Sequence, residues 1–335
     1  MKPILSLFAA SVISVAAFSQ VSVEPDVSAN DLVFDFLLGS GVLIEDVEYG
    51  GADIQIGSFM DMGVIGLDSG LVMSTADVEN IDAGNDAPAF GEVPFGEGVS
   101  GDADLLDIAN SVPPLIGQNF SISAINDVVS LEFDFIPYGD SLAFNYIFGS
   151  DEYPVWVNTA FNDAFAFFIS GPGITGPYSA PDGFPDGAEN IAFVPGTDPN
   201  VPITVSSIND QTNSEFYVDN IDNEGIYVNG YTTVLTAYKT GLTVGETYHI
   251  RLALGDGSDT ALESIVALQA GSFSAYSTTE NVGDPGDLDF DGDIDVNDLL
   301  ELLENQGCQG FDCIGDINGD GIVNVMDILE FLGLF

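Results

Sequence analysis

Two stretches near the carboxyl end place oxygen-bearing residues at alternate positions of a twelve-residue loop. Position 6 is Gly292 in the first loop and Gly321 in the second, and glycine permits the sharp backbone turn that such a loop needs. Side-chain oxygens at alternate positions, with a backbone carbonyl at position 7, converge on one hard cation. The spacing therefore predicts two bound calcium ions. The ligands expected in the first loop are Asp287, Asp289, Asp291, Asp293, Asp295 and Asp298. Those expected in the second loop are Asp316, Asn318, Asp320, Ile322, Asn324 and Asp327.

Both loops lead into a helical pattern, and the second copy follows the first with an offset of 29 residues: 295–303 aligns with 324–332. Apolar residues recur at i, i+3 and i+4, so each helix should bury one apolar stripe against the other. The expected stripes are Leu299, Leu302 and Leu303, then Ile328, Phe331 and Leu332. Residues 287–335 are thus expected to form a small all-α calcium-binding helix pair, too small to fold without its metal.

The two cysteines, Cys308 and Cys313, lie close together between these repeats. In an oxidising compartment such a pair is expected to form a local disulfide, which stabilises by about 2 kcal/mol in the chain-entropy model. A zinc site would need two further soft ligands, and the one histidine, His249, lies in a different segment.

A third cation site is suggested by acidic residues that follow or precede strand-like runs in the middle of the chain. If the strand ends converge, their oxygens could surround a hard cation such as calcium. The alternative is that Asn162, Asp163 and Asp256 only cap turns through side chain to backbone hydrogen bonds. The residues concerned are Asp151, Glu152, Asn162, Asp163, Asp256 and Asp259.

The elements that would position these groups are short apolar runs separated by Gly, Asp, Asn and Pro, over residues 31–273. In the run 129–136, Val, Leu and Phe alternate with Ser, Glu and Asp, which is the period of a strand with one buried face. Many such runs predict a mainly β fold, an antiparallel β-sandwich of jelly-roll type. Residues 274–286 lose the pattern and are expected to form a linker.

Charge excludes a whole class of partners: 54 acidic residues stand against 3 Lys and Arg, a formal net charge of −51. Binding to nucleic acid needs clustered cations, so no nucleic-acid partner is expected.

Residues 1–19 have the basic start, apolar run and small residues of a signal peptide, which predicts export; residues 20–30 form a short segment before the β region. No other run is long enough to span a bilayer, so no transmembrane segment is expected.

Catalysis is not expected. The chain has no Gly-x-Ser-x-Gly elbow and no phosphate-binding loop, and with so many carboxylates no single pair stands out as that of a glycosidase. His249 is interpreted as a packed strand residue. Trp156 and its neighbour Tyr153 could stack on a sugar ring, but aromatic residues of strands usually lie in the core.

The tandem calcium loops, each with Asp at position 12 and an amphipathic helix after it, resemble dockerin modules over about residues 284–335. The resemblance implies docking to a cohesin-like or other cell-surface protein. In dockerins, positions 10 and 11 help to choose the partner and often hold small hydroxyl residues. Here these positions hold Val296-Asn297 and Val325-Met326.

Most of residues 31–273 resembles the choice-of-anchor L domain, whose proteins join a shared domain to varied C-terminal anchoring modules. The resemblance implies a location at the cell surface more than a chemistry. The motifs that carry it are Leu37-Leu-Gly-Ser-Gly-Val42, Gly70-Leu-Val-Met-Ser-Thr75, Phe148-Gly-Ser-Asp-Glu-Tyr-Pro154, Phe161-Asn-Asp-Ala-Phe-Ala-Phe-Phe-Ile-Ser-Gly-Pro-Gly173, Asn190-Ile-Ala-Phe-Val-Pro-Gly196 and Asp256-Gly-Ser-Asp259.

Taken together, the residues and the resemblances predict a secreted, non-catalytic, calcium-binding protein of the cell surface or extracellular matrix. Its β region would serve display, adhesion or ligand binding, and its tail would attach it to a partner. The alternative is a component of a polysaccharide-degrading complex, whose β region binds or cleaves glycan. Glycan binding or release of reducing sugar by the β region would favour the alternative.

Overall fold

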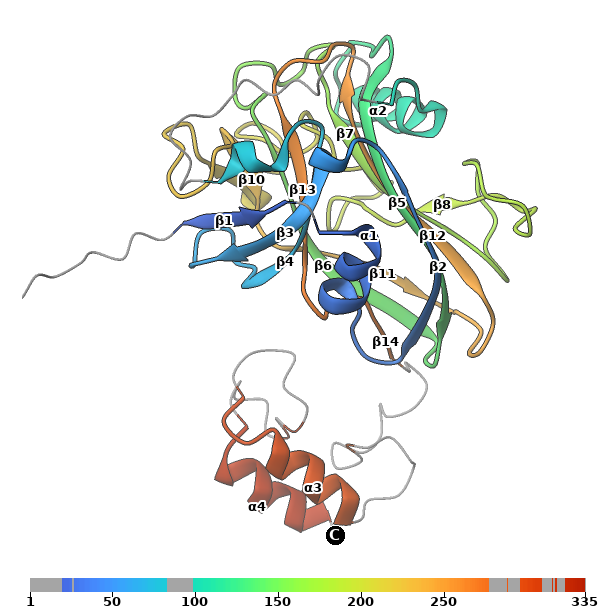
Figure 1. Cartoon of the computed structure of the whole chain (residues 1–335), viewed down its shortest axis with the longest axis vertical. Coiled ribbons are helices and arrows are strands. Elements are labelled where there is room, and N and C mark those ends of the chain that lie inside the picture. Colours follow the sequence, from blue (N-terminus) through green and yellow to red (C-terminus); the bar gives the residue numbers. More distant parts are fainter. Residues whose placement is uncertain are drawn as a thin grey trace, which may run out of the picture.

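Runs of β-branched and aromatic residues between residues 21 and 276 form nearly all of the regular structure (Figure 1). The computed structural model describes residues 20–25, 27–82, 99–276, 288, 296–308, 315, 317 and 323–334. Within these residues, every pairing between the named strands is antiparallel, and the strands form two sheets. The expectation of a mainly β, antiparallel domain is therefore confirmed, while the jelly-roll path of the chain stays a prediction.

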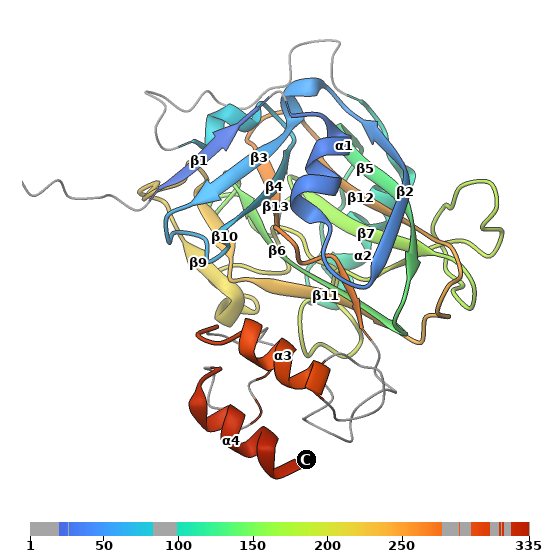
Figure 2. The same cartoon turned by 60° about the horizontal axis from the view of Figure 1, so that its bottom comes forward.

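The larger sheet has nine strands among the described residues and is strongly curled, like half of a barrel (Figure 2). Strand β6 is its hub, because it pairs with β13 and β14 along one side and with β10 and β11 along the other. The strands of this sheet are β1 (Val21–Glu24), β3 (Ile56–Asp61), β4 (Ser69–Ser74), β13 (Ser264–Gln269), β6 (Ser141–Ser150), β10 (Gly230–Thr232), β9 (Tyr217–Asp219), β11 (Leu235–Thr240) and β14 (Ser274–Tyr276).

The smaller sheet has five strands, in the order β2 (Val42–Gly50), β5 (Ile125–Pro137), β12 (Tyr248–Gly257), β7 (Ala164–Ser170) and β8 (Glu189–Asn190). Its strand β5 shows why the sequence folds in this way. Val129, Leu131, Phe133 and Phe135 are all buried, whereas Ser130, Glu132 and Asp134 between them are partly exposed. The alternation read from the sequence thus gives the strand one face in the core and one face toward water.

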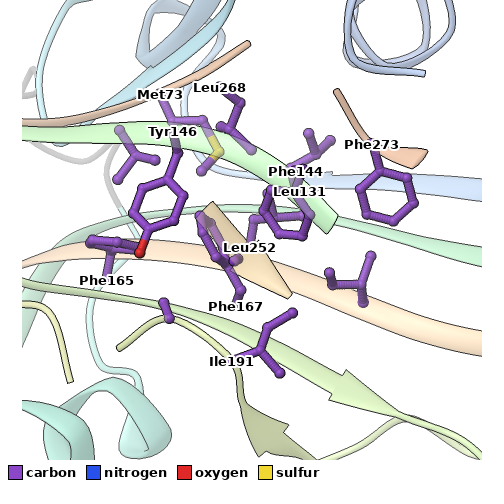
Figure 3. Close-up of a cluster of buried hydrophobic side chains, with 14 of the residues drawn as sticks. Met73, Leu131, Phe144, Tyr146, Phe165, Phe167, Ile191, Leu252, Leu268 and Phe273 are labelled. Atoms are coloured by element: carbon purple, nitrogen blue, oxygen red, sulfur yellow. The ribbon is translucent and has the colours of Figure 1, made fainter. Parts of the chain in front are cut away.

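The inner faces of the two sheets share one apolar core, in which aromatic rings from β6 meet rings from β7 (Figure 3). The ring of Tyr146 lies 4.9 Å from that of Phe167 and 5.3 Å from that of Phe165, both in edge-to-face contact. Phe273, just before β14, contacts Phe133 and Phe135 in the same way. Such aromatic contacts add to the large apolar area that the rings bury, so they hold the two sheets together.

Helical segments are short in the described part of the β-domain. The longest, α2 (Ala103–Leu115), begins at Asp102, whose carboxylate accepts the N–H of Leu105, and it packs its apolar stripe on the outer face of the smaller sheet. The others are α1 (Ala29–Asp31), a π-helix (Leu32–Leu37), and three 3-10 turns at Asp53–Gln55, Val78–Ile81 and Ser214–Phe216.

Near the carboxyl end, helices α3 (Val296–Glu304) and α4 (Val325–Leu334) share a small apolar cluster that includes Leu302 and Phe331. Two residues of the expected stripes, Leu303 and Leu332, are exposed instead. Asp298 and Asp327, both fully buried, take up part of the buried side of each helix instead. Both helices lie where the sequence has a helical pattern; the calcium-binding helix pair stays a prediction.

Candidate functional site

Acidic residues gather at one end of the two sheets, where β6 and β12 end and where β7 and β13 begin. Antiparallel pairing produces this meeting, because it sets Ser150 opposite Ser264 and Gly255 opposite Ala164. The connections that leave and enter these strands carry the carboxyl groups. We call the group formed by Asp151, Glu152, Asp163, Asp256, Asp259 and Glu263 the acidic cluster.

Four carboxyl groups of the acidic cluster, those of Glu152, Asp163, Asp256 and Glu263, belong to residues that are at most 2% exposed. Burying a charge is costly unless a partner of opposite sign or a cation accompanies it. The two cationic residues of the β-domain are engaged elsewhere. Lys239 pairs with Glu189 at 2.5 Å, and the guanidinium of Arg251 binds Asp102 and Asp104 at 2.5 and 3.0 Å.

The carboxylate of Asp163 ties two strands together. Its Oδ1 accepts the backbone N–H of Gly257 at 2.8 Å, and its Oδ2 accepts the hydroxyl of Ser264 at 2.7 Å. Gly257 is required for this approach, since a Cβ at that position would lie 2.7 Å from the backbone oxygen of Asn162. The end of β12 therefore comes close enough to position Asp163 only because it carries glycine.

Two oxygens of the acidic cluster are buried and have no hydrogen-bond partner among the described residues: Oε2 of Glu152 and Oδ1 of Asp256. Buried polar atoms in native proteins are nearly always satisfied, and each exception calls for a physical explanation. In a cluster of carboxyl groups, a proton on the carboxyl group, an ordered water molecule or a bound cation can satisfy such oxygens.

The electrostatics of the acidic cluster favour the uptake of a proton or a cation. Burial, together with the charges of Asp163, Asp259 and Asp151, raises the pKa of Glu152 to about 9. Burial also raises the pKa of Asp163 to about 7, although hydrogen bonds from Ser264 and Gly257 work against it. The pKa of Glu263 rises to about 8 through burial, and that of Asp256 lies well above its ordinary value for the same reason. At neutral pH, several of these groups hold protons unless a cation replaces them.

The structure brings together five of the six residues predicted for the third cation site: Asp151, Glu152, Asp163, Asp256 and Asp259 influence one another's pKa. The sixth, Asn162, serves another role. Its Oδ1 accepts the N–H of Ser206 at 2.8 Å, which is the capping role that the alternative predicted. Glu263 was not predicted. It lies beside Asp151: its carboxylate accepts the hydroxyl of Ser74 at 2.5 Å, and burial together with the charge of Asp151 raises its pKa.

In the part of the chain that the structure describes, no three Asp, Glu, His or Cys side chains are already arranged around a point where a metal ion could sit. The carboxyl groups of the acidic cluster are therefore neighbours rather than a preformed coordination shell. A cation would bind there with some adjustment of side chains and with loss of protons.

The C-terminal loops show one repeated contact. The carboxylate of Asp298, at position 12 of the first loop, accepts the N–H of Leu288 at 2.5 Å, and Asp327 accepts the N–H of Ile317 at 3.0 Å. Leu288 and Ile317 both stand at position 2 of their loops, so the last ligand of each loop reaches back to its start. Both aspartates are fully buried.

Asn324, the ligand predicted at position 9 of the second loop, also lies among the described residues: its N–H donates to Asp327, and its Oδ1 accepts the N–H of Met326. The other predicted ligands lie outside the described residues. They are Asp287, Asp289, Asp291, Asp293, Asp295, Asp316, Asn318, Asp320 and Ile322. Residues 1–19 and Cys313 also lie outside, so the signal peptide and the disulfide stay predictions.

His249 lies on the outer side of β12, between two carboxylates of β5. Its Nδ1 is 2.9 Å from Asp134 and its Nε2 is 3.3 Å from Glu132. Of the two aromatic residues considered for sugar stacking, Tyr153 is buried and donates to the carbonyl of Ile208, whereas Trp156 is 40% exposed. Tyr153 is therefore a core residue.

None of the helices in the described part of the chain is long and apolar enough to cross a membrane. Comparison with known families gives one match: the model described as the choice-of-anchor L domain matches residues 20–274. No curated protein and no solved structure matches the chain.

Proposed function

The chain belongs to the choice-of-anchor L domain family, and from this premise we propose that it is a secreted, non-catalytic, calcium-binding protein of the cell surface or extracellular matrix. Its β-domain serves display or ligand binding, and its C-terminal helix pair attaches it to a partner protein. The observation that carries the proposal is the burial of Glu152, Asp163, Asp256 and Glu263 together, with both cationic residues of the β-domain engaged elsewhere.

Calcium suits the acidic cluster because it takes oxygen ligands in variable number and geometry. Glu152 and Asp256 each offer a buried oxygen that has no other partner among the described residues. Asp163 would supply a third oxygen, and Asp259, which is partly exposed, stands where an ion would enter. Outside cells, a divalent ion would take the place of the protons that the raised pKa values otherwise hold in the cluster.

For the C-terminal segment we propose a dockerin-like module with two calcium ions, a disulfide between Cys308 and Cys313, and docking to a cohesin-like or other cell-surface protein. The repeated contact of Asp298 and Asp327 supports two equivalent loops. For the β-domain, we propose that its sheets follow a jelly-roll path.

Exposed apolar residues on both helices support the attachment role. Val296, Leu300 and Leu303 on α3, and Val325, Leu329 and Leu332 on α4, are each at least 45% exposed. The two sets are related by the 29-residue repeat, so each helix presents the same apolar row. In a chain with a net charge of −51, contiguous apolar surface of this kind is typical of a protein interface.

The family and the acidity support the proposed location. Choice-of-anchor domains are named for surface proteins, and a surface as acidic as this one is stabilised by cations in the medium. We also propose that residues 1–19 direct export.

Isothermal calorimetry with calcium tests the proposal on the chain without residues 1–19. We expect uptake of about three ions, two in the C-terminal loops and one in the acidic cluster. The double variant Asp298→Ala, Asp327→Ala should retain one ion, and adding Asp163→Asn should remove it. Glu45→Gln, which changes an exposed carboxylate of β2, is the matched control and should leave uptake unchanged.

Absence of any uptake by the parent chain at millimolar calcium would reject the whole proposal. If the double variant takes up no ion, only the site in the β-domain is rejected.

A further inference from the structure

One surface of the larger sheet lacks the charge that marks the rest of the molecule. A cavity of about 450 Å³ opens over β6, β11 and the segment before β14, and none of the residues that line it is charged. Charged residues make up 17% of the chain, nearly all of them acidic, so this surface contrasts with its surroundings. A ligand seated there would not have to approach carboxylates or displace their water.

A row of neutral polar side chains crosses three neighbouring strands along this cavity. The amide of Asn145 on β6 donates to Oε1 of Gln269 on β13 at 2.8 Å, and the hydroxyl of Thr236 on β11 donates to Oδ1 of Asn145 at 2.7 Å. These bonds orient the row: the oxygen of Thr236 is left to accept at one end, and the NH₂ of Gln269 to donate at the other. Ligand hydroxyl groups, which donate and accept at once, match both ends.

Two exposed tyrosines stand on either side of β6. Tyr276 on β14 is 45% exposed and pairs with Ser141, while Tyr238 on β11 is 64% exposed and pairs with Ala143. Because adjacent strands lie about 4.8 Å apart, β14 and β11 are separated by about 10 Å. Ala143, whose side chain is small, lies between them and lines the cavity together with Tyr276. We call the surface between the two tyrosines the trough.

We infer that this trough binds a neutral oligosaccharide. Aromatic rings contact the apolar faces of sugar rings, and the Thr, Asn and Gln row hydrogen-bonds to sugar hydroxyls. Two rings on strands about 10 Å apart suit several linked sugars better than a single one. The charge of the molecule selects among glycans, since a polysaccharide of uronic acids would be repelled by the acidic surface around the trough.

This inference goes beyond the proposed function, because it names a ligand class and a site that does not involve the acidic cluster or the C-terminal loops. A second cavity, of about 350 Å³, lies along the other side of β11 and shares Thr236 with the first. It is lined by Tyr238 and by the ion pair of Lys239 with Glu189, which leaves it without net charge. The neutral surface therefore continues across β11, as an extended ligand requires.

Calorimetric titration of the chain without residues 1–19 tests the inference, with hexasaccharides of β-1,4-glucan, β-1,3-glucan, xylan and mannan as probes and an oligogalacturonate as the acidic comparator. At least one neutral probe should bind, with an affinity that changes little with salt, and the oligogalacturonate should not. Tyr276→Ala and Tyr238→Ala should each weaken binding by about tenfold or more, and Asn145→Ala by a similar factor. Phe34→Ala removes an exposed ring that lines neither cavity and should leave affinity unchanged.

Thermal melting checks that each variant is folded. Ala143→Phe tests the trough in a second way. The larger side chain fills the trough without removing any hydrogen-bonding group, so it should weaken binding of the neutral probes. Absence of binding to every neutral probe, preference for the oligogalacturonate, or affinity unchanged in both tyrosine variants would each overturn the inference. The titration is repeated in the presence of a chelator. If a neutral hexasaccharide still binds there, the result supports a glycan site in the trough even if the β-domain takes up no calcium.

Discussion

The backbone N–H of Gly257 donates to Oδ1 of Asp163 at 2.8 Å, so a residue at the end of β12 holds the carboxylate that precedes β7. Both strands belong to the smaller sheet, yet Oδ2 of the same carboxylate accepts from Ser264, the first residue of β13 in the larger sheet. One buried aspartate thus joins the two sheets at the acidic end of the β-domain.

Replacing Gly257 by Ala should disrupt this junction. The added Cβ would lie 2.7 to 2.9 Å from backbone atoms of Asn162, closer than packing allows, so the end of β12 must move away from Asp163. We expect a loss of about 1–3 kcal/mol of unfolding free energy, measured by urea denaturation. Gly333→Ala is the matched control, since it meets no atom within 4 Å, and it should be neutral or slightly stabilising. Equal stability of the two variants would contradict the prediction.

Without divalent cations, the protein should lose stability as the pH rises. The pKa values of Asp151, Asp163, Glu263 and Glu152 are raised by burial to about 6, 7, 8 and 9, above ordinary values of 3.8 for Asp and 4.5 for Glu. The folded state therefore binds more protons than the unfolded state between about pH 4 and 9, and its stability falls as these groups ionise. Melting temperatures in chelator from pH 5 to 9 should decline.

Calcium should reduce this decline in melting temperature, because the ionised carboxylates then bind a cation. The apparent affinity of the protein for calcium should itself rise with pH. Glu152→Gln should flatten this decline in chelator, since it removes a carboxyl group whose pKa is raised to about 9. A melting temperature that rises with pH in chelator would show that the cluster is not protonated in the folded state.

Asp298→Ala and Asp327→Ala should produce matching defects, because the two carboxylates make the same contact with position 2 of their loops. In each variant, the helical circular dichroism that calcium restores after chelation should be smaller than in the parent chain. Helicity that does not respond to chelation in the parent chain would contradict metal-coupled folding of the segment.

His249 should remain protonated at higher pH than an ordinary histidine. Burial lowers the pKa of its imidazole, but the hydrogen bonds and charges of Glu132 and Asp134 outweigh burial and raise it above 6.5. Because His249 is the one histidine in the chain, its ring protons can be followed by NMR without ambiguity. Asp134→Asn should lower the pKa, whereas Glu224→Gln, an exposed carboxylate, should not change it. The stability that this pairing adds is present at low pH and lost as the pH rises through the raised pKa.

Local patterns predicted the strands well and the acidic cluster in part. Residues 129–135 alternate so regularly that one buried face was expected, and the structure has it. Asn162 and Asp163 could not both face the cluster, since neighbouring residues of an extended chain point to opposite sides, and sequence spacing does not say which one does. Glu263 was missed because its place depends on the register of β13 with β6, which is set by packing across the whole sheet. The neutral trough joins residues more than 120 positions apart, such as Asn145 and Gln269, so no local pattern could predict it.

The position of Phe273 has a mechanical consequence for a protein tethered through its C-terminal segment. Tension on the chain beyond Tyr276 would first reach β14, which is held to β6 by three residue pairs and to Ser40 by the N–H of Ala275. The buried ring of Phe273 lies three residues further in, wedged against Phe133, Phe135 and Phe144. In a chain attached through that segment, extraction of this ring from the core would be the step at which tension begins to separate the two sheets.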